Sequence, residues 1–155
     1  MQKVDELFRR VLDEHRELRA LGGELSEFLE RPRPEVGQNG AHTWAASLAR
    51  MLVTFHDKVF RHFRDEEDSG CLDELVAAKP RAARAVDALR EEHGRLLADL
   101  RSALDSAMMY SESKPPECLT LRRATRSILE RFDRHEHEET ELIQSLLCDD
   151  LGLGD

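Results

Sequence analysis

The segment RHFRDEE, residues 61–67, contains a histidine that is followed four residues later by a glutamate. Four residues are about one turn of an α-helix, so His62 and Glu66 lie on the same helix face. The apolar residues Phe55 and Val59 precede them at four- and three-residue steps and continue that face. An amphipathic helix turns such a face toward a core. The segment therefore predicts a helix that carries two polar side chains into the protein interior.

The same pattern recurs in the second half of the chain, in the segment RHEHEE at residues 134–139. Here Phe132, His135, Glu139 and Leu142 follow one another at three- and four-residue steps. Burying an unpaired carboxylate costs roughly several kcal/mol of free energy. Two inward-facing glutamates on two different helices therefore require a common explanation.

Each half also contains one further inward-facing histidine. His15 lies in the apolar series of the first segment, and His93 lies between Leu89 and Leu96. The chain thus has the pattern H…HxxxE twice, one pair of helices for each repeat. Packing the two pairs with approximate two-fold symmetry brings four imidazoles and two carboxylates together. Imidazole and carboxylate groups in this number predict a site for two metal ions.

Breaks in the apolar pattern divide the chain into four long helical segments. Pro32 and the glycines within residues 31–41 predict a first loop, and residues 111–116 predict another. No alternating pattern typical of β-strands is present. We therefore predict an all-α fold, in which residues 1–155 form a single domain, an antiparallel up-down four-helix bundle. A short extra helical turn, residues 72–78, is expected between the second and third helices. The four helices are predicted at about 3–30, 42–68, 80–110 and 117–148.

The composition narrows the class of protein. The 155 residues carry 23 basic and 32 acidic side chains, which gives a net charge of −9. This balance is unfavourable for binding nucleic acid or an anionic membrane surface. Nothing in the sequence has the length and hydrophobicity of a membrane span or a signal peptide. The three cysteines, Cys71, Cys118 and Cys148, are far apart and are predicted to be ordinary free thiols in the cytoplasm.

Other helical metal sites and other kinds of catalytic site fit the sequence less well. A ferritin-like di-iron bundle uses a Glu-x-x-His motif, but no glutamate stands three residues before any of the seven histidines. The HExxH motif of zinc proteases is absent. No serine or cysteine on the apolar faces is placed to act as a nucleophile activated by histidine.

The remaining histidines are not predicted to be ligands. His137 begins a third HxxxE pair, but it lies about 200° around the helix from His135, on the solvated face. His56 lies at the edge of its apolar face, and His42 is expected to be exposed at a helix start. The charged residues within 130–138 that lie outside the apolar face are likewise predicted to be solvated surface.

These segments resemble the hemerythrin-like family, in particular its members with an H-HxxxE-H-HxxxE pattern. The resemblance runs from about Val4 to the chain end and rests on EHREL around His15, HFRDEE from His62, REEHGRLL around His93 and RHEHEETELIQ from Arg134. It implies a four-helix bundle around a non-haem di-iron centre, with zinc or manganese as alternative metals. The implied ligands are His15, His62, His93 and His135 at the ends and Glu66 and Glu139 as bridges, with a water-derived oxo or hydroxo group as a further bridge.

One departure from the oxygen-carrying hemerythrins changes the expected function. Those proteins have an HxxxH pair on the third helix, whereas here Leu97 follows His93 by four residues and Leu89 precedes it by four. Six protein ligands in place of seven leave each metal with water or an open position. The sequence therefore favours binding of, or reaction with, dioxygen, peroxide or nitric oxide over reversible oxygen transport.

Two alternatives to this function stay open. The first is an iron store or sensor without turnover, and the second is a metal-free helical interaction domain. Whether the chain is an enzyme is not decided by the sequence; turnover would make it a catalase- or peroxidase-like oxidoreductase. The expected partner is a small diatomic molecule or peroxide, and the sequence identifies no protein partner.

Overall fold

The computed structural model describes residues 2–31, 38–112 and 118–150, and within these ranges all regular structure is helical. The predicted all-α class is therefore confirmed for the described part of the chain. The helices are α1 (Gln2–Glu30), α2 (Gln38–Ser69), α3 (Cys71–Ala78), the 3-10 turn η1 (Pro80–Ala82), α4 (Ala83–Glu112) and α5 (Cys118–Asp150).

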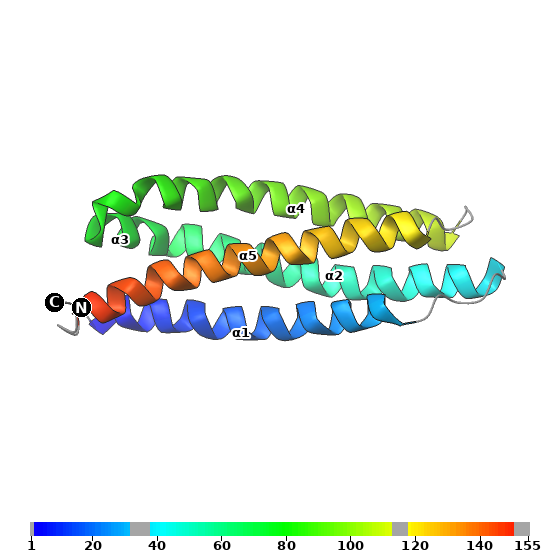
Figure 1. Cartoon of the computed structure of the whole chain (residues 1–155), viewed down its shortest axis with the longest axis horizontal. Helices are drawn as coiled ribbons and strands as arrows, with labels where there is room; N and C mark the ends of the chain where they lie inside the picture. Colours follow the sequence, from blue (N-terminus) through cyan, green and yellow to red (C-terminus); the bar gives the residue numbers. More distant parts are fainter. Residues whose placement is uncertain (1, 32–37, 113–117, 151–155) are drawn as a thin grey trace.

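Four long helices lie side by side along the length of the molecule (Figure 1). The most extensive contacts join α1 to α2, α2 to α4, α4 to α5 and α5 to α1, so each long helix has two principal neighbours. The short helix α3 contacts all four of them at one end of the bundle. It is the extra helical piece that the sequence predicts between the second and third long helices.

Two helix starts differ from the sequence prediction. α2 begins at Gln38 and not near residue 42, so Asn39 and Gly40 lie in its first turn and not in a loop. The first four N–H groups of a helix have no partner within the helix, so weak helix formers cost little there. Pro80 begins the 3-10 turn, and the α-helical part of that segment begins at Ala83.

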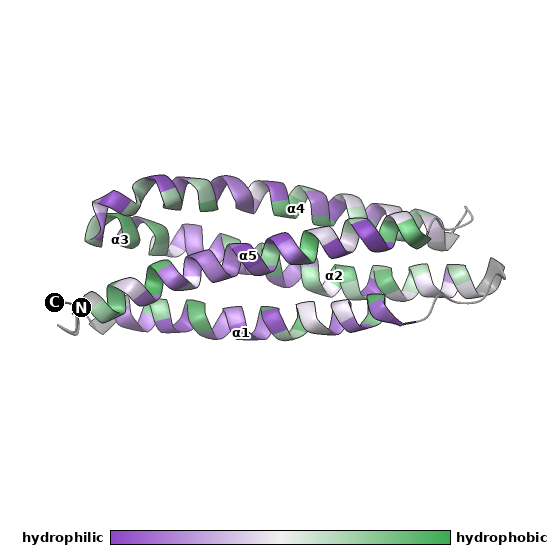
Figure 2. Cartoon of the chain, in the orientation of Figure 1, coloured by the Kyte–Doolittle hydropathy of each residue, from purple (hydrophilic) through white to green (hydrophobic). Residues whose placement is uncertain are grey.

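The apolar interior consists of two clusters. The larger one contains Leu48, Phe55 and Leu100. The smaller one joins α3 to the neighbouring ends of the long helices and includes Leu72 and Ile143. Hydrophobic and hydrophilic residues alternate along each long helix (Figure 2).

One detail of the predicted apolar faces is corrected. Leu142, predicted to face inward, is only half-buried, and its neighbour Ile143 is fully buried. Ile143 follows Glu139 by four residues, which is about one helical turn, so both side chains point toward the interior. Cys71 lies at the buried first turn of α3, and burial raises the pKa of its thiol well above the usual range.

None of the described helices is long and apolar enough to cross a membrane.

The core can be tested with two adjacent residues of α2. Leu52 is fully buried, whereas Val53 is 43% exposed. Leu52→Ala should lower the free energy of unfolding by about 2–5 kcal/mol, because it leaves a cavity. Val53→Ala should change it by less than about 0.5 kcal/mol. Urea unfolding followed by circular dichroism measures both, and equal losses would contradict the assigned helix orientation.

Candidate metal centre

The six predicted ligand residues all lie in the interior. Each has at most 3% of its surface exposed, although all are polar. They come from all four long helices: His15 from α1, His62 and Glu66 from α2, His93 from α4, and His135 and Glu139 from α5. We refer to these six residues as the His/Glu centre.

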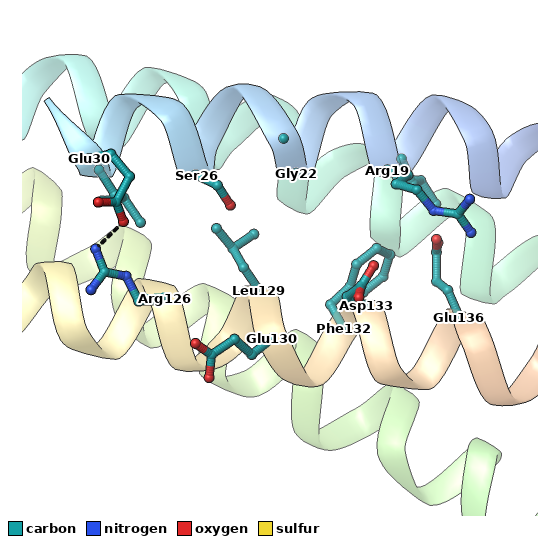
Figure 3. Close-up of a pocket in the computed structure, with 13 residues that line it drawn as sticks. Arg19, Gly22, Ser26, Glu30, Arg126, Leu129, Glu130, Phe132, Asp133 and Glu136 are labelled. Atoms are coloured by element: carbon teal, nitrogen blue, oxygen red, sulfur yellow. Dashed lines mark hydrogen bonds and ion pairs between the residues drawn. The ribbon is translucent and has the colours of Figure 1, made fainter.

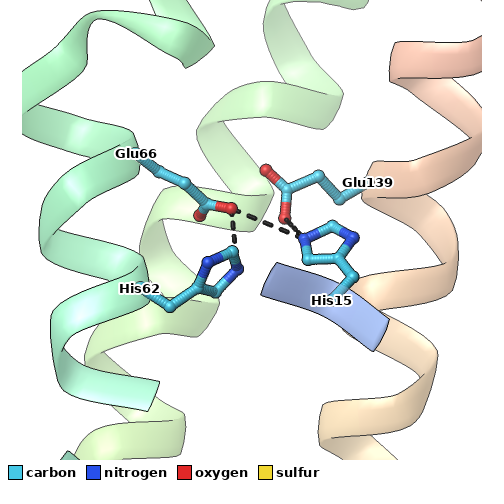
Figure 4. Close-up of side chains that lie close together, drawn as sticks. All are labelled: His15, His62, Glu66 and Glu139. Atoms are coloured by element: carbon cyan, nitrogen blue, oxygen red, sulfur yellow. Dashed lines mark ion pairs between the residues drawn. The ribbon is translucent and has the colours of Figure 1, made fainter. Parts of the chain in front are cut away.

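Four members of the centre lie especially close together (Figure 4). His15, His62, Glu66 and Glu139 each offer a ligand atom, and these atoms lie within 4.8 Å of one another. The His62 Nε2 atom is 2.8 Å from Glu66 Oε1. The His15 Nε2 atom is 3.4 Å from Glu139 Oε2 and 3.6 Å from Glu66 Oε1. The four groups therefore converge on one small volume that a cation could occupy.

The other two histidines lie near the same two carboxylates. The His93 Nε2 atom is 3.4 Å from Glu66 Oε2, and the His135 Nε2 atom is 3.9 Å from Glu139 Oε2. The two imidazole rings have centroids 4.9 Å apart. Glu66 thus turns Oε1 toward His15 and His62 and Oε2 toward His93, which is the arrangement that a bridging carboxylate needs.

The inward-facing atoms of the centre lack hydrogen bonds. In the described part of the chain, no hydrogen bond is made by Nε2 of any of the four imidazoles or by any carboxylate oxygen of Glu66 and Glu139. Buried polar atoms are almost always satisfied, so a group of them in one place indicates an absent partner. Nitrogen and carboxylate oxygen donors in this set suit a transition-metal ion.

The outward nitrogen of three imidazoles has a hydrogen-bond partner. His62 Nδ1 is 2.8 Å from a Glu14 carboxylate oxygen, and His93 Nδ1 is 2.9 Å from one of Glu67. An imidazole N–H that donates to a carboxylate fixes the ring and leaves Nε2 free to bind a metal. Glu14 and Glu67 stand next to ligand candidates in the sequence, but each acts on a histidine of another helix. Sequence reasoning therefore missed them.

Neither of the remaining two imidazoles is bonded to a carboxylate through its outward nitrogen among the described residues. His15 Nδ1 is 2.9 Å from the Thr140 hydroxyl oxygen. His135 Nδ1 has no hydrogen-bond partner among the described residues. Burial, together with the nearby His93, lowers the pKa of His135 to about 3.

The pKa values of His15 and His62 shift upward, in the opposite direction to that of His135. Burial alone would lower the pKa of His15, but Glu139 and Glu66 raise it to about 9. Burial is likewise outweighed at His62, where Glu14 and Glu66 raise the pKa to about 10. Without a metal, protons on these rings balance the buried carboxylates.

The two buried carboxylates titrate in opposite directions. Burial would raise the pKa of Glu66, but the neighbouring His15 and His62 lower it. Burial and the charge of Glu66 raise the pKa of Glu139. A metal cation in the centre would replace the protons that these groups share.

One residue contradicts the sequence prediction. Glu136 was predicted to lie on the solvated face within residues 130–138, yet it is only 1% exposed, and its Oε1 has no partner among the described residues. Burial raises its pKa to about 7. Glu136 lies four residues after Phe132 and three before Glu139, both of which are buried. The buried face of α5 is thus wider than the narrow stripe of apolar residues indicates.

The other histidines lie outside the centre. The exposed His137 is 3.4 Å from Glu141, as the helical register predicts. His56 is half-buried, and its ring stacks on Phe60. His42 is half-buried, which corrects the expected exposure, because its Nδ1 bonds to the Tyr110 carbonyl oxygen at 2.7 Å.

A comparison with protein families agrees with this geometry. The family model described as hemerythrin HHE cation binding domain matches residues 6–147. The chain belongs to the hemerythrin HHE cation-binding family. The matched range contains all six residues of the His/Glu centre. Neither the curated proteins nor the solved structures contain a match to this hemerythrin-like chain.

The buried carboxylate outside the centre gives a pH-dependent prediction. The pKa of Glu136 in the fold, about 7, lies above its ordinary value of 4.5, so the folded chain keeps a proton that the unfolded chain loses. This contribution to stability is complete below about pH 4.5 and is lost as the pH rises through about 7. In the metal-free protein at about pH 8, Glu136→Gln should raise the free energy of unfolding by about 1–3 kcal/mol.

Urea unfolding at about pH 5 and about pH 8 measures this effect. Glu138→Gln is the matched control, because Glu138 is exposed on the same helix. The burial of Glu136 would be contradicted if the two variants had the same stability at both pH values.

The carboxylates that hold the imidazoles give a second prediction. Glu14→Ala and Glu67→Ala should each weaken metal binding about 10- to 100-fold, because His62 and His93 lose their orienting acceptors. Competition with a chromophoric chelator measures this affinity. Glu17→Ala on the exposed face of α1 should leave it unchanged. An unchanged affinity in both test variants would show that these hydrogen bonds do not orient ligands.

Proposed function

We propose that this chain is a non-haem di-iron protein whose centre binds or reacts with dioxygen, peroxide or nitric oxide. The observation that carries the proposal is the position of Glu66, whose Oε1 lies near His15 and His62 and whose Oε2 lies near His93 in a fully buried site. Membership of a cation-binding family supports it independently.

The ligand assignment follows the distances. His15 and His62 would hold one iron, and His93 and His135 would hold the other. Glu66 and Glu139 would bridge them, since each has an oxygen near histidines of both pairs. Two carboxylates also offset much of the charge of two buried dications. When bound, iron with open coordination positions supplies redox chemistry toward small oxygen species.

Aromatic side chains of the chain keep the centre dry. Phe63 stacks on the His93 ring with centroids 3.9 Å apart and meets the His135 ring edge-on at 5.2 Å. Phe132 lies next to Phe63, and both are buried. Exclusion of water strengthens the electrostatic interactions of bound ions and limits access to small molecules.

Reversible oxygen carriage is less well supported. The residues one turn from His93 are Leu89 and Leu97, and neither can bind a metal. Six protein ligands shared by two metals favour a centre with exchangeable positions on both. Whether the centre turns over its reactant or only binds it is decided by measuring the reaction of the iron-loaded protein with the three small molecules.

The second candidate is an iron store or sensor without turnover. It is favoured by the lack of hydrogen bonds at the inward atoms of the centre, because metal occupancy would then contribute directly to folding. A metal-free interaction domain is the third candidate. It leaves the lack of hydrogen bonds at the inward-facing atoms of the centre, within the described residues, without an explanation.

The proposal also covers the direction of the helices, the class of partner and the location of the protein. The helices alternate in direction as an antiparallel up-down bundle, and the lengthwise packing of neighbouring helices supports this order. The reactant is a small molecule, and neither nucleic acid nor membrane is a partner, which the net charge of −9 supports. The protein is cytoplasmic, which the widely spaced cysteines support.

Elemental analysis of the purified protein tests the metal assignment. We expect about two irons per chain, and near-ultraviolet bands after the reduced protein is mixed with dioxygen, hydrogen peroxide or nitric oxide. His62→Ala should remove about half of the iron or more. His137→Ala is the matched control, because His137 also has a glutamate four residues later but is exposed.

The outcomes separate the three candidates. Iron without any reaction toward the three molecules would leave the store or sensor function. No bound metal in the wild-type protein, and no uptake of iron on anaerobic reconstitution, would leave the metal-free domain.

Removal of metal tests the link between the centre and the fold. A chelator in excess should lower the melting temperature by about 5 °C or more, because the buried carboxylates then lack their cations. Thermal unfolding followed by circular dichroism measures the change. Equal melting temperatures with and without metal would argue against a sensor whose folding depends on iron.

A further inference from the structure

A cavity of about 400 Å³ lies between α1 and α5 (Figure 3). Its lining includes Leu18, Phe132 and Glu136. Each of these three residues lies one helical turn from a residue of the centre. The cavity is large enough for several water-sized molecules, since one water occupies about 30 Å³ in the liquid.

Two adjacent glycines in the middle of α1 line this cavity. Gly22 and Gly23 each cost about 1 kcal/mol relative to alanine in a helix interior. Packing does not require them, because a Cβ on Gly22 would meet only a Phe55 ring carbon at 3.9 Å, and one on Gly23 would meet nothing within 4 Å. Neither glycine has a positive φ. The effect of their missing side chains is open space between α1 and α5.

The cavity also contains an unsatisfied polar group. Glu136 is almost completely buried, and its Oε1 makes no hydrogen bond within the described ranges. Figure 3 shows its side chain extending from α5 toward α1 near Arg19. A buried carboxylate oxygen without a hydrogen bond is costly, so Oε1 of Glu136, a residue that lines the cavity, indicates a ligand that hydrogen-bonds to it.

We propose that the α1–α5 cavity admits and binds a small uncharged hydrogen-bonding molecule, of which hydrogen peroxide is the simplest, and that Glu136 holds it beside the His/Glu centre. This inference rests on the proposed di-iron function and narrows its reactant. Hydrogen peroxide donates and accepts hydrogen bonds, whereas dioxygen and nitric oxide carry no hydrogen to donate. Glu136 therefore makes the cavity selective for peroxide.

A second cavity, on the other side of α5, is less suitable as an access route. It is lined by Ala88 and His135 among others. Arg131 also lines it and pairs with Glu92 and Asp99 of α4. These ion pairs cross the space between α4 and α5. One ion pair, between Arg126 and Glu30, also joins α5 to α1 across the α1–α5 cavity, but it lies at the end of that cavity away from Glu136 (Figure 3).

Thiol labelling of the metal-free protein tests access without any reaction at a metal. In the Glu136→Cys variant, the rate of modification by methyl methanethiosulfonate is followed by mass spectrometry of the peptide that contains position 136. Adding Gly23→Leu should slow this modification about tenfold or more, because the larger side chain fills the cavity. Adding Ala88→Leu, which fills the second cavity, should change it by less than about twofold. Equal slowing by both, or by neither, overturns the assigned route.

Oxidation of the reduced iron-loaded protein tests the role of Glu136. Glu136→Leu should slow oxidation by hydrogen peroxide about tenfold, the value of about one hydrogen bond, and slow oxidation by dioxygen much less. Glu136→Gln should retain most of the peroxide rate, because an amide still forms hydrogen bonds. Iron content must equal that of the wild type in both variants. Equal slowing toward the two oxidants overturns the selectivity.

The two hypotheses fail in different ways. If the wild-type protein binds no iron or reacts with no small molecule, the proposed function fails, and the labelling rates still decide whether the cavity is open to small molecules. If iron binds and reacts but the Glu136 and Gly23 variants behave as the wild type, the cavity inference alone fails.

Discussion

The burial of two carboxylates, Glu66 and Glu139, is the constraint on which the rest of the structure depends. Neither has more than 1% of its surface exposed, and neither has a hydrogen bond to its oxygens among the described residues. An isolated ionised carboxylate in an apolar interior is very unfavourable. Four imidazoles from four helices surround this pair, and a cation would satisfy all six groups. The helices are long because each must extend past this polar layer to reach apolar contacts on both sides.

The polar layer explains why the apolar core has two parts. On α1, Phe8 and Val11 belong to the smaller cluster and Leu18 to the larger one, with His15 between them. On α5, Phe132 and Ile143 are separated in the same way. The short helix α3 completes the smaller cluster, which the ends of the four long helices would otherwise leave open. The centre is therefore enclosed by apolar packing at both ends, while α1 and α5 leave a cavity at its side.

The sequence predicted the helical class and the burial of the six site residues because both follow from the repeat of the α-helix. Residues three and four apart share a helix face whatever the neighbouring helices are. The orienting roles of Glu14 and Glu67 were not predictable in this way, because each acts across to another helix. Glu136 was misplaced for a related reason. Its burial depends on how closely α1 approaches α5, and the pattern of α5 alone contains no information about that distance.

The four interfaces between neighbouring helices are not held in the same way. At three of them a largely buried imidazole hydrogen-bonds across to the next helix: Glu14 with His62, Glu67 with His93, and Thr140 with His15. At the fourth, between α4 and α5, Arg131 pairs with Glu92 and Asp99, and its side chain is 31% exposed. Dissolved salt screens exposed charges far more than buried ones. High ionic strength therefore weakens the Arg131 ion pairs, and they lie at the interface of His135, whose Nδ1 has no hydrogen-bond partner among the described residues.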